Sequence, residues 1–189
     1  MKSINTASTG YWKAALVTFA MVVGTAVMMA ACSSVKAPAK EYSQDRLVEA
    51  IRVPAGHSVE LETTGVGVLN YECRATGWTL TGPKADLIDR TGKNVGSYSG
   101  PPATWTHVDG SSVVGTQVTV SPMVGATNIP LQLSKGTSGT NAGVLQNISY
   151  IQRINTKGGQ DLSKACAQAD IGDKLTLPFQ ADYIFWKAA

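Results

Sequence analysis

Trp105, His107 and Asp109 are the residues of this chain whose types and spacing are best suited to chemistry. They occupy every second position, and side chains at every second position of a β-strand lie on the same face. An aromatic ring, a titratable imidazole and a carboxylate would then line one groove, with Tyr98 as a further aromatic residue nearby. We therefore take Trp105, His107, Asp109 and Tyr98 as candidate ligand-binding residues.

A structural role for the same residues is the competing interpretation. Asp109 precedes Gly110, and an Asp-Gly pair is a strong signal for a hairpin turn. Trp105 and Tyr98 are large aromatic residues, whose usual place is the core. We therefore predict no catalytic residue and favour a non-catalytic protein, a binding or structural module. A small hydrolase that uses a groove around Trp105, His107 and Asp109 is the alternative.

Common catalytic motifs do not strengthen the case for an enzyme. The sequence has no Gly-x-Ser-x-Gly elbow and no phosphate-binding loop, and a polar strand pattern follows Gly65-Val66-Gly67 where a dinucleotide-binding motif requires a helix. His57 and His107 are the only histidines, too few for a multi-histidine metal site. The sequence predicts neither a cofactor nor a metal.

The residues around Cys32 indicate where the protein works. Lys2 and Lys13 precede an uncharged apolar run over residues 14–31, which is the order of an export signal. Ala30 and Ala31 directly before Cys32 resemble the lipobox of bacterial lipoproteins, in which the cysteine is lipidated and becomes the new N-terminus. Met29 departs from this pattern, because the box usually has Leu there.

Lipidation at Cys32 would anchor the protein to a membrane. Ser33 after the cysteine resembles an outer-membrane address, so we predict a domain on the outer membrane that faces the periplasm or the cell surface. The predicted segments are a signal peptide over 1–31, a lipidated N-terminus and flexible tether over 32–43, and a single domain over 44–189. Cleaved secretion and a retained membrane-spanning helix are the alternatives.

The charge of the predicted mature chain argues against nucleic acid as a partner. Lys2 and Lys13 leave with the signal, which lowers the formal net charge from +3 to +1. A nucleic-acid binder normally carries a basic stripe, whereas the charges of this chain are interspersed. The predicted partners are the membrane, through the lipid, and an envelope protein, glycan or lipid as ligand.

Cys73 and Cys166 remain once Cys32 is assigned to the lipid. In an oxidising compartment such a pair more often forms a disulfide than a metal or redox site. Two free buried thiols are the alternative.

Alternation of apolar and polar residues predicts the elements that position these side chains. The pattern is strong in segments bounded by Gly, Pro, Asn and Asp, and a helical period is almost absent from the predicted domain. Gly65 and Gly67 are expected to separate two strands, Pro178 to mark an edge or a bulge, and residues 135–143 to form a loop. The pattern predicts an all-β fold, a single antiparallel β-sandwich or distorted barrel with long loops, preceded by a signal-peptide helix. The main expected strands are 57–63, 68–74, 85–89, 113–120, 129–133, 148–155 and 175–185.

Several short stretches of the chain resemble a family of exported bacterial and fungal proteins known as domain of unknown function 3455. The resemblance implies export and a β-rich fold, and it brings no established activity. It spans residues 45–187. Two places depart from the pattern: the segment that precedes Trp105, and Leu131. The stretches that carry it are Arg52-Val53-Pro54-Ala55-Gly56-His57, Tyr71-Glu72-Cys73, Ala85-Asp86-Leu87-Ile88-Asp89, Asp109-Gly110-Ser111, Ile151-Gln152-Arg153, Thr156-Lys157-Gly158-Gly159 and Ala181-Asp182-Tyr183.

Overall fold

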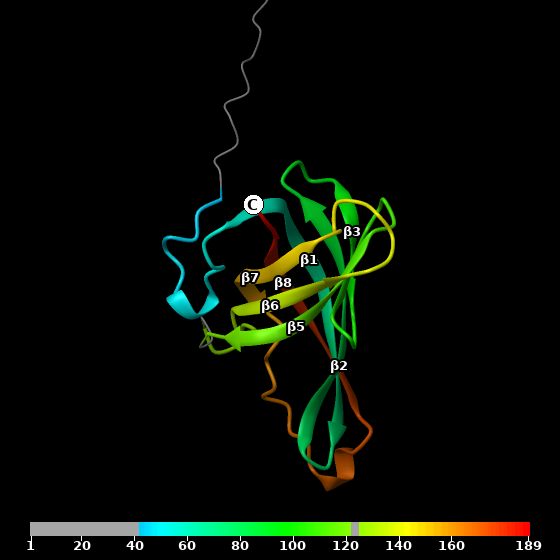
Figure 1. Ribbon diagram of the computed structural model, residues 1–189. Coiled ribbons are helices and arrows are strands. Elements are labelled where there is room, and N and C mark those ends of the chain that lie inside the picture. The colour runs from blue at the N-terminus through cyan, green and yellow to red at the C-terminus, as the bar shows by residue number, and fades with distance from the viewer. Residues whose placement is uncertain (1–41, 122–124) are drawn as a thin grey trace, which may run out of the picture. The chain divides into compact units, whose positions relative to one another are not determined.

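The computed structural model describes residues 42–121 and 125–189. In this part of the chain, antiparallel strands follow one another around a closed barrel, and the last strand pairs with the first (Figure 1). The all-β prediction is confirmed, with the barrel as the architecture. The strands are β1 (His57–Arg74), β2 (Gly77–Asp89), β3 (Asn94–Ser99), β4 (Thr104–His107), β5 (Ser112–Val120), β6 (Gln132–Ser138), β7 (Ile148–Gly158) and β8 (Lys174–Ala188), with short 3₁₀ turns η1 (Glu49–Ile51) and η2 (Gln168–Asp170).

The barrel closes along the pair formed by β1 and β8. This pairing runs from His57 opposite Ala188 to Glu72 opposite Lys174. β1, β2 and β8 are the longest strands, and the ends of all three project beyond the barrel (Figure 1). A disulfide between Cys73 and Cys166 joins the projecting end of β1 to the loop that carries η2. The predicted disulfide is therefore confirmed.

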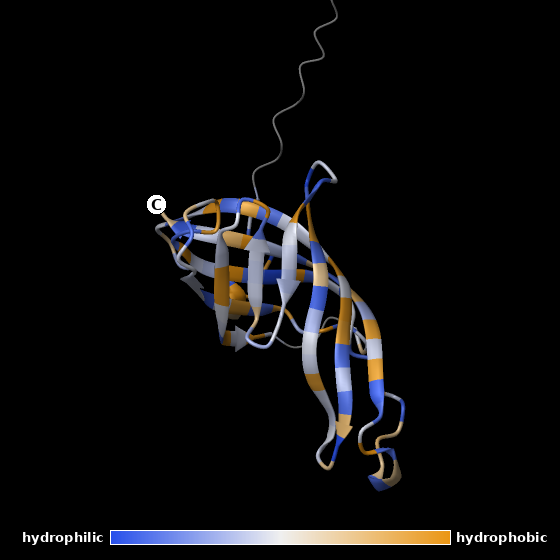
Figure 2. Ribbon diagram, turned by 90° about the vertical axis from the view of Figure 1, so that its right-hand side faces the viewer, coloured by the Kyte–Doolittle hydropathy of each residue, from blue (hydrophilic) through white to orange (hydrophobic). Residues whose placement is uncertain are grey.

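Aromatic and aliphatic side chains fill the interior of the barrel. The alternation that drives them inward appears as hydrophobic and hydrophilic bands along the long strands (Figure 2). Two glycines make room for the largest rings: a Cβ on Gly65 would lie 2.6 Å from the Tyr183 ring, and one on Gly115 would lie 2.6 Å from the Trp105 ring. The buried residues of this interior core include Leu69, Tyr71, Leu87, Tyr98, Trp105, Val113, Ile148, Ile151, Phe179, Tyr183 and Phe185.

A second core lies outside the barrel wall, under residues 42–56. We call these residues the N-terminal strap. The fully buried Ile51 and the neighbouring Val53 of the strap pack against outward-facing residues of the barrel, namely Leu133, Ile154, Ile184 and Trp186. Gln44 bonds both the N–H and the carbonyl of Val53 at 2.8 Å, and the Gln152 amide donates to the Ile51 carbonyl at 2.6 Å. The strap is thus fixed to the barrel by apolar packing and by hydrogen bonds.

Three local predictions differ from the structure, and a fourth agrees with it. β1 continues through Gly65 and Gly67, because these glycines accommodate neighbouring groups and do not form a turn. β6 begins at Gln132 and runs to Ser138, so the expected strand over 129–133 and the expected loop over 135–143 were both misplaced. Pro178 lies beyond the end of β7, whose last pair is Gly158 with Phe179, and therefore sits at an edge as predicted.

The predicted signal peptide with its helix and most of the tether, including Cys32, lie outside the described residues. Within residues 42–121 and 125–189, no helix is long and apolar enough to span a membrane.

Candidate functional site

Trp105 and Tyr98 lie inside the barrel. Trp105 on β4 and Tyr98 on β3 are opposite each other in the sheet, and their rings stack with centroids 4.6 Å apart. Only 2% of Trp105 and 7% of Tyr98 is exposed. Both rings also contact Tyr183, so they form part of the interior core. The structure therefore does not place Trp105 in a surface groove with His107 and Asp109.

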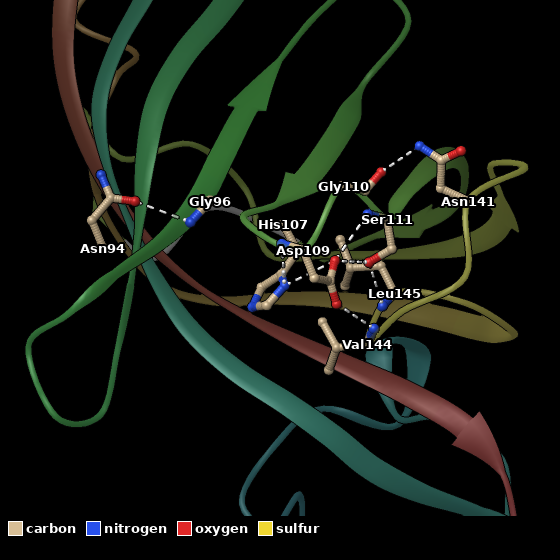
Figure 3. Close-up of polar contacts among 9 residues, drawn as sticks. All are labelled: Asn94, Gly96, His107, Asp109, Gly110, Ser111, Asn141, Val144 and Leu145. Atoms are coloured by element: carbon tan, nitrogen blue, oxygen red, sulfur yellow. Dashed lines mark hydrogen bonds and ion pairs between the residues drawn. The ribbon is translucent and has the colours of Figure 1, made fainter.

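His107 and Asp109 do come together, at the turn between β4 and β5. β4 ends at His107, and the turn returns the chain to β5 through Gly110, whose φ is +88°. The His107 Nδ1 atom lies 3.1 Å from the Asp109 Oδ1 atom, and the backbone N–H of Asp109 donates to the same Nδ1 at 3.3 Å (Figure 3). Asp109 lies in the turn beyond the end of β4, so the turn, and not strand alternation, brings its carboxylate to the imidazole.

The Asp109 carboxylate fastens this turn to the loop between β6 and β7. Oδ1 accepts hydrogen bonds from the Ser111 hydroxyl at 2.6 Å and from the Ser111 N–H at 2.9 Å, while Oδ2 accepts from the Val144 N–H at 2.8 Å (Figure 3). The Leu145 N–H donates in turn to the Ser111 hydroxyl. These donors, with the Ser111 hydroxyl as the largest contribution, hold the pKa of Asp109 well below its usual range.

The geometry of this network differs from that of a nucleophilic triad. A serine nucleophile needs its hydroxyl on the histidine, with the carboxylate on the far side of the imidazole. Here the Ser111 hydroxyl donates to Asp109 itself, and Ser111 is fully buried. The arrangement is suited to holding a loop, because the hydrogen bonds from Ser111 and Val144 tie the turn to the loop beside it.

A groove on the outer face of the barrel gathers a second set of polar side chains. It has a volume of about 320 Å³. One wall is Tyr42 of the N-terminal strap, and the others come from β1, β2, β7 and β8 with the residue that follows β2. The lining residues are Tyr42, Glu62, Thr63, Thr64, Ile88, Arg90, Ile154, Asn155, Asp182 and Ile184.

Asp182 carries the central carboxylate of the groove. Its Oδ1 accepts a hydrogen bond from the Thr64 hydroxyl at 2.7 Å, and its Oδ2 accepts one from the Asn155 amide, also at 2.7 Å. Thr64 faces Asp182 directly across the β1–β8 pair. Asn155 reaches Asp182 from an irregular point of β7, where its φ is +49°, a conformation that Asn tolerates better than most residues. Three strands thus position one carboxylate with two neutral donors.

Glu62 and Tyr42 complete the polar lining. Glu62 forms an ion pair with Arg90, and only 18% of the Glu62 side chain is exposed against 49% of Arg90. The Tyr42 hydroxyl donates to the Gln152 side chain at 2.8 Å. Burial, followed by the nearby Asp182 carboxylate, raises the pKa of Tyr42, so the phenol stays protonated. The groove therefore holds two carboxylates, one guanidinium and neutral hydrogen-bonding groups.

Sequence patterns alone did not reveal this groove. Its residues come from five segments that lie between Tyr42 and Ile184, and the pairing of β1 with β2 and β8, and of β8 with β7, brings them together. Alternation does place Glu62 and Thr64, two positions apart, on the same face of β1. It also places Asp182 on the outward face of β8. That local signal indicates a solvated face and nothing more specific.

The family comparison covers most of the domain that forms this groove. No curated protein and no solved structure matches the chain. A family model does match residues 54–187, which include β1 to β8 except the last residue of β8, and every groove residue apart from Tyr42. The chain therefore belongs to the family described as protein of unknown function DUF3455.

Proposed function

We propose that this protein is a non-catalytic binding module of the bacterial envelope, anchored by lipid on Cys32 to the outer membrane, that holds its ligand in the outer groove. The observation that carries the proposal is the groove itself. It joins hydrogen-bonding groups from β1, β7 and β8, and from Arg90 after β2, to a wall supplied by the strap. The predicted tether leads directly into that strap. A few well-placed polar groups in a concave site are typical of ligand recognition.

The anchor is supported by the sequence before the barrel. Ala30-Ala31-Cys32 follows an apolar export signal, and bacterial lipoproteins carry several acyl chains, enough for stable attachment. Tyr42 is ten residues after Cys32, so the tether reaches at most about 35 Å when fully extended. The groove would accordingly work close to the membrane surface.

Two measurements test the proposal. Cys32→Ala should move the protein from the outer-membrane fraction to the soluble fraction or to the unprocessed precursor. For the groove, we compare Arg90→Cys, which places a thiol in the groove, with the control Asp86→Cys on the exposed face of β2. Bound ligand should slow labelling of position 90 by a thiol reagent in intact envelopes relative to purified protein, with no such difference at position 86.

Two results would contradict the proposal. Unchanged fractionation and processing of Cys32→Ala would remove the lipid anchor. Equal labelling of position 90 in envelopes and in purified protein would mean that the groove is empty where the protein works.

The alternative of a small envelope hydrolase rests on the His107–Asp109 contact of 3.1 Å. The partners of Asp109 favour a structural role for that contact, since they tie the turn to the β6–β7 loop. A hydrolytic activity that is lost in His107→Ala, with the fold intact, would favour the enzyme.

A further inference from the structure

We propose that the outer groove binds a neutral, hydroxyl-rich ligand, a segment of an oligosaccharide, with Asp182, Thr64 and Asn155 as its hydrogen-bonding centre. This inference rests on the proposed function, because it names the ligand class of the same groove. Three properties of the described residues carry it: the remaining hydrogen-bonding capacity around Asp182, the charge balance of the groove, and its apolar lining.

The hydrogen-bonding groups match a ligand that both donates and accepts. Each oxygen of the Asp182 carboxylate accepts one bond from a neutral donor, and a carboxylate oxygen has capacity for about two. The Thr64 hydroxyl gives its proton to Asp182 and keeps its lone pairs as acceptors. The Asn155 amide uses one of two N–H groups on Asp182 and has a carbonyl as acceptor. Neighbouring sugar hydroxyls can satisfy such a mixed set, since each hydroxyl both donates and accepts.

The charge of the groove disfavours an anionic ligand. Glu62 and Asp182 bring two negative charges, and Arg90 brings one positive charge that is already paired with Glu62. A phosphate, sulfate or carboxylate of a ligand would approach Asp182, whose hydrogen-bond partners Thr64 and Asn155 are neutral. Like-charge contact of this kind is unfavourable in a site partly shielded from water. The same argument disfavours the phosphate of a lipid headgroup.

The rest of the lining suits the C–H faces of a sugar ring. Ile88 and the ring of Tyr42 are partly exposed in the groove, above Ile154 and Ile184, which are buried in the core under the strap. Aromatic and aliphatic surface next to a few polar groups is the usual composition of a ligand site. A volume of about 320 Å³ is at the small end of the usual range for ligand sites, so the groove would take a short segment of a longer chain.

The experiment titrates the purified mature lipoprotein, held in detergent micelles, with two probes. One is a neutral oligomer of N-acetylglucosamine, and the other is an oligogalacturonate of similar length, which carries carboxylates. We expect the neutral oligomer alone to bind by calorimetry. Asp182→Asn should weaken its binding at least tenfold, because bonds to a charged acceptor are the stronger ones. Thr64→Val alters no charge and should also weaken binding of the neutral oligomer. Asp86→Asn on the exposed face of β2 is the matched control.

Each result supports or overturns the inference. Binding of the neutral oligomer that falls in Asp182→Asn and Thr64→Val, with thermal midpoints close to that of the parent protein, supports it. No binding of the neutral oligomer, or equal binding by the groove variants and by Asp86→Asn, overturns it. If labelling of position 90 is slowed in envelopes although no neutral oligomer binds, the ligand class is wrong while the groove remains a binding site. If the labelling is not slowed either, the proposed function fails as well.

Discussion

Asp109 shows how hydrogen-bond partners determine the role of a carboxylate. Its position two residues after His107 suggested a titratable pair, and the contact of 3.1 Å exists. The bonds from Ser111 and Val144, however, come from a neighbour in the turn and from a loop 35 residues further along. Such long-range partners cannot be identified from local sequence, because they depend on how the β6–β7 loop packs against the turn between β4 and β5.

The lowered pKa of Asp109 predicts a pH-dependent stability. A carboxyl whose pKa is lower in the folded state contributes stability above its ordinary value, about 3.8, and loses it as the pH falls toward the folded-state value. Asp109→Asn should therefore melt at a lower temperature than the parent protein at pH 7, and the difference should shrink on acidification below about pH 4. Thermal melts of both proteins between pH 7 and pH 3 test this, and a difference that stays constant over this range would contradict it.

Gly65 is the residue whose substitution most directly tests the packing of the interior. A Cβ there would lie 2.6 Å from the Tyr183 ring, in a barrel with little room to adjust. We expect Gly65→Ala to destabilise the protein by about 1–3 kcal/mol in chemical denaturation. In a Tyr183→Leu background the same change should cost less, and equal costs in the two backgrounds would show that the ring is not the cause.

At the scale of elements, alternation predicted most strands, whereas their ends and pairing depended on tertiary contacts. The edge position of Pro178 could be predicted because a proline has no backbone N–H to donate to a neighbouring strand, and this is known from the residue alone. Gly65 and Gly67 were taken as breaks because glycine is common in turns, but here they allow close approach within one long strand. The sequence did not distinguish a sandwich from a barrel, since no local pattern specifies that β1 pairs with β8. The groove was missed for the same reason.

The disulfide belongs to the projecting ends of the long strands, and its removal should be costly. Cys73 and Cys166 are 93 positions apart, so the bond restricts most of the unfolded domain. A double Cys73→Ser, Cys166→Ser variant should lose about 4–5 kcal/mol of unfolding free energy. Urea denaturation measures this, and the parent protein under reductant is the control, which should shift by a similar amount. A loss below about 1 kcal/mol would show that the bond does not constrain the unfolded chain as expected.

At the scale of the whole domain, two cores share one barrel wall. Residues of β7 and β8 face the interior core on one side and the N-terminal strap on the other, as Tyr183 and Ile184 illustrate. Because the same strands support both cores, loss of one should remove the other. The strap is thereby a part of the cooperative unit, and the groove wall at Tyr42 depends on the barrel behind it.

This shared wall predicts a single unfolding transition. Trp105 reports on the interior core and Trp186 on the core under the strap. Each tryptophan is isolated in a variant that carries Trp→Phe changes at the other tryptophan positions. In each variant we expect the denaturation midpoint measured by fluorescence to coincide with the midpoint measured by circular dichroism. A Trp186 midpoint at clearly lower denaturant than the circular dichroism midpoint would mean that the strap detaches first.

The pair that closes the barrel also determines when the protein can fold. His57 lies opposite Ala188, so β1 lacks one of its neighbours until β8, more than 100 residues further along the chain, is available. Contacts so distant in sequence form slowly, because the intervening chain must be ordered to bring them together. A chain threaded through a membrane from its N-terminus would thus remain unfolded during passage, and the groove, built on that pair, would exist only once transport is complete.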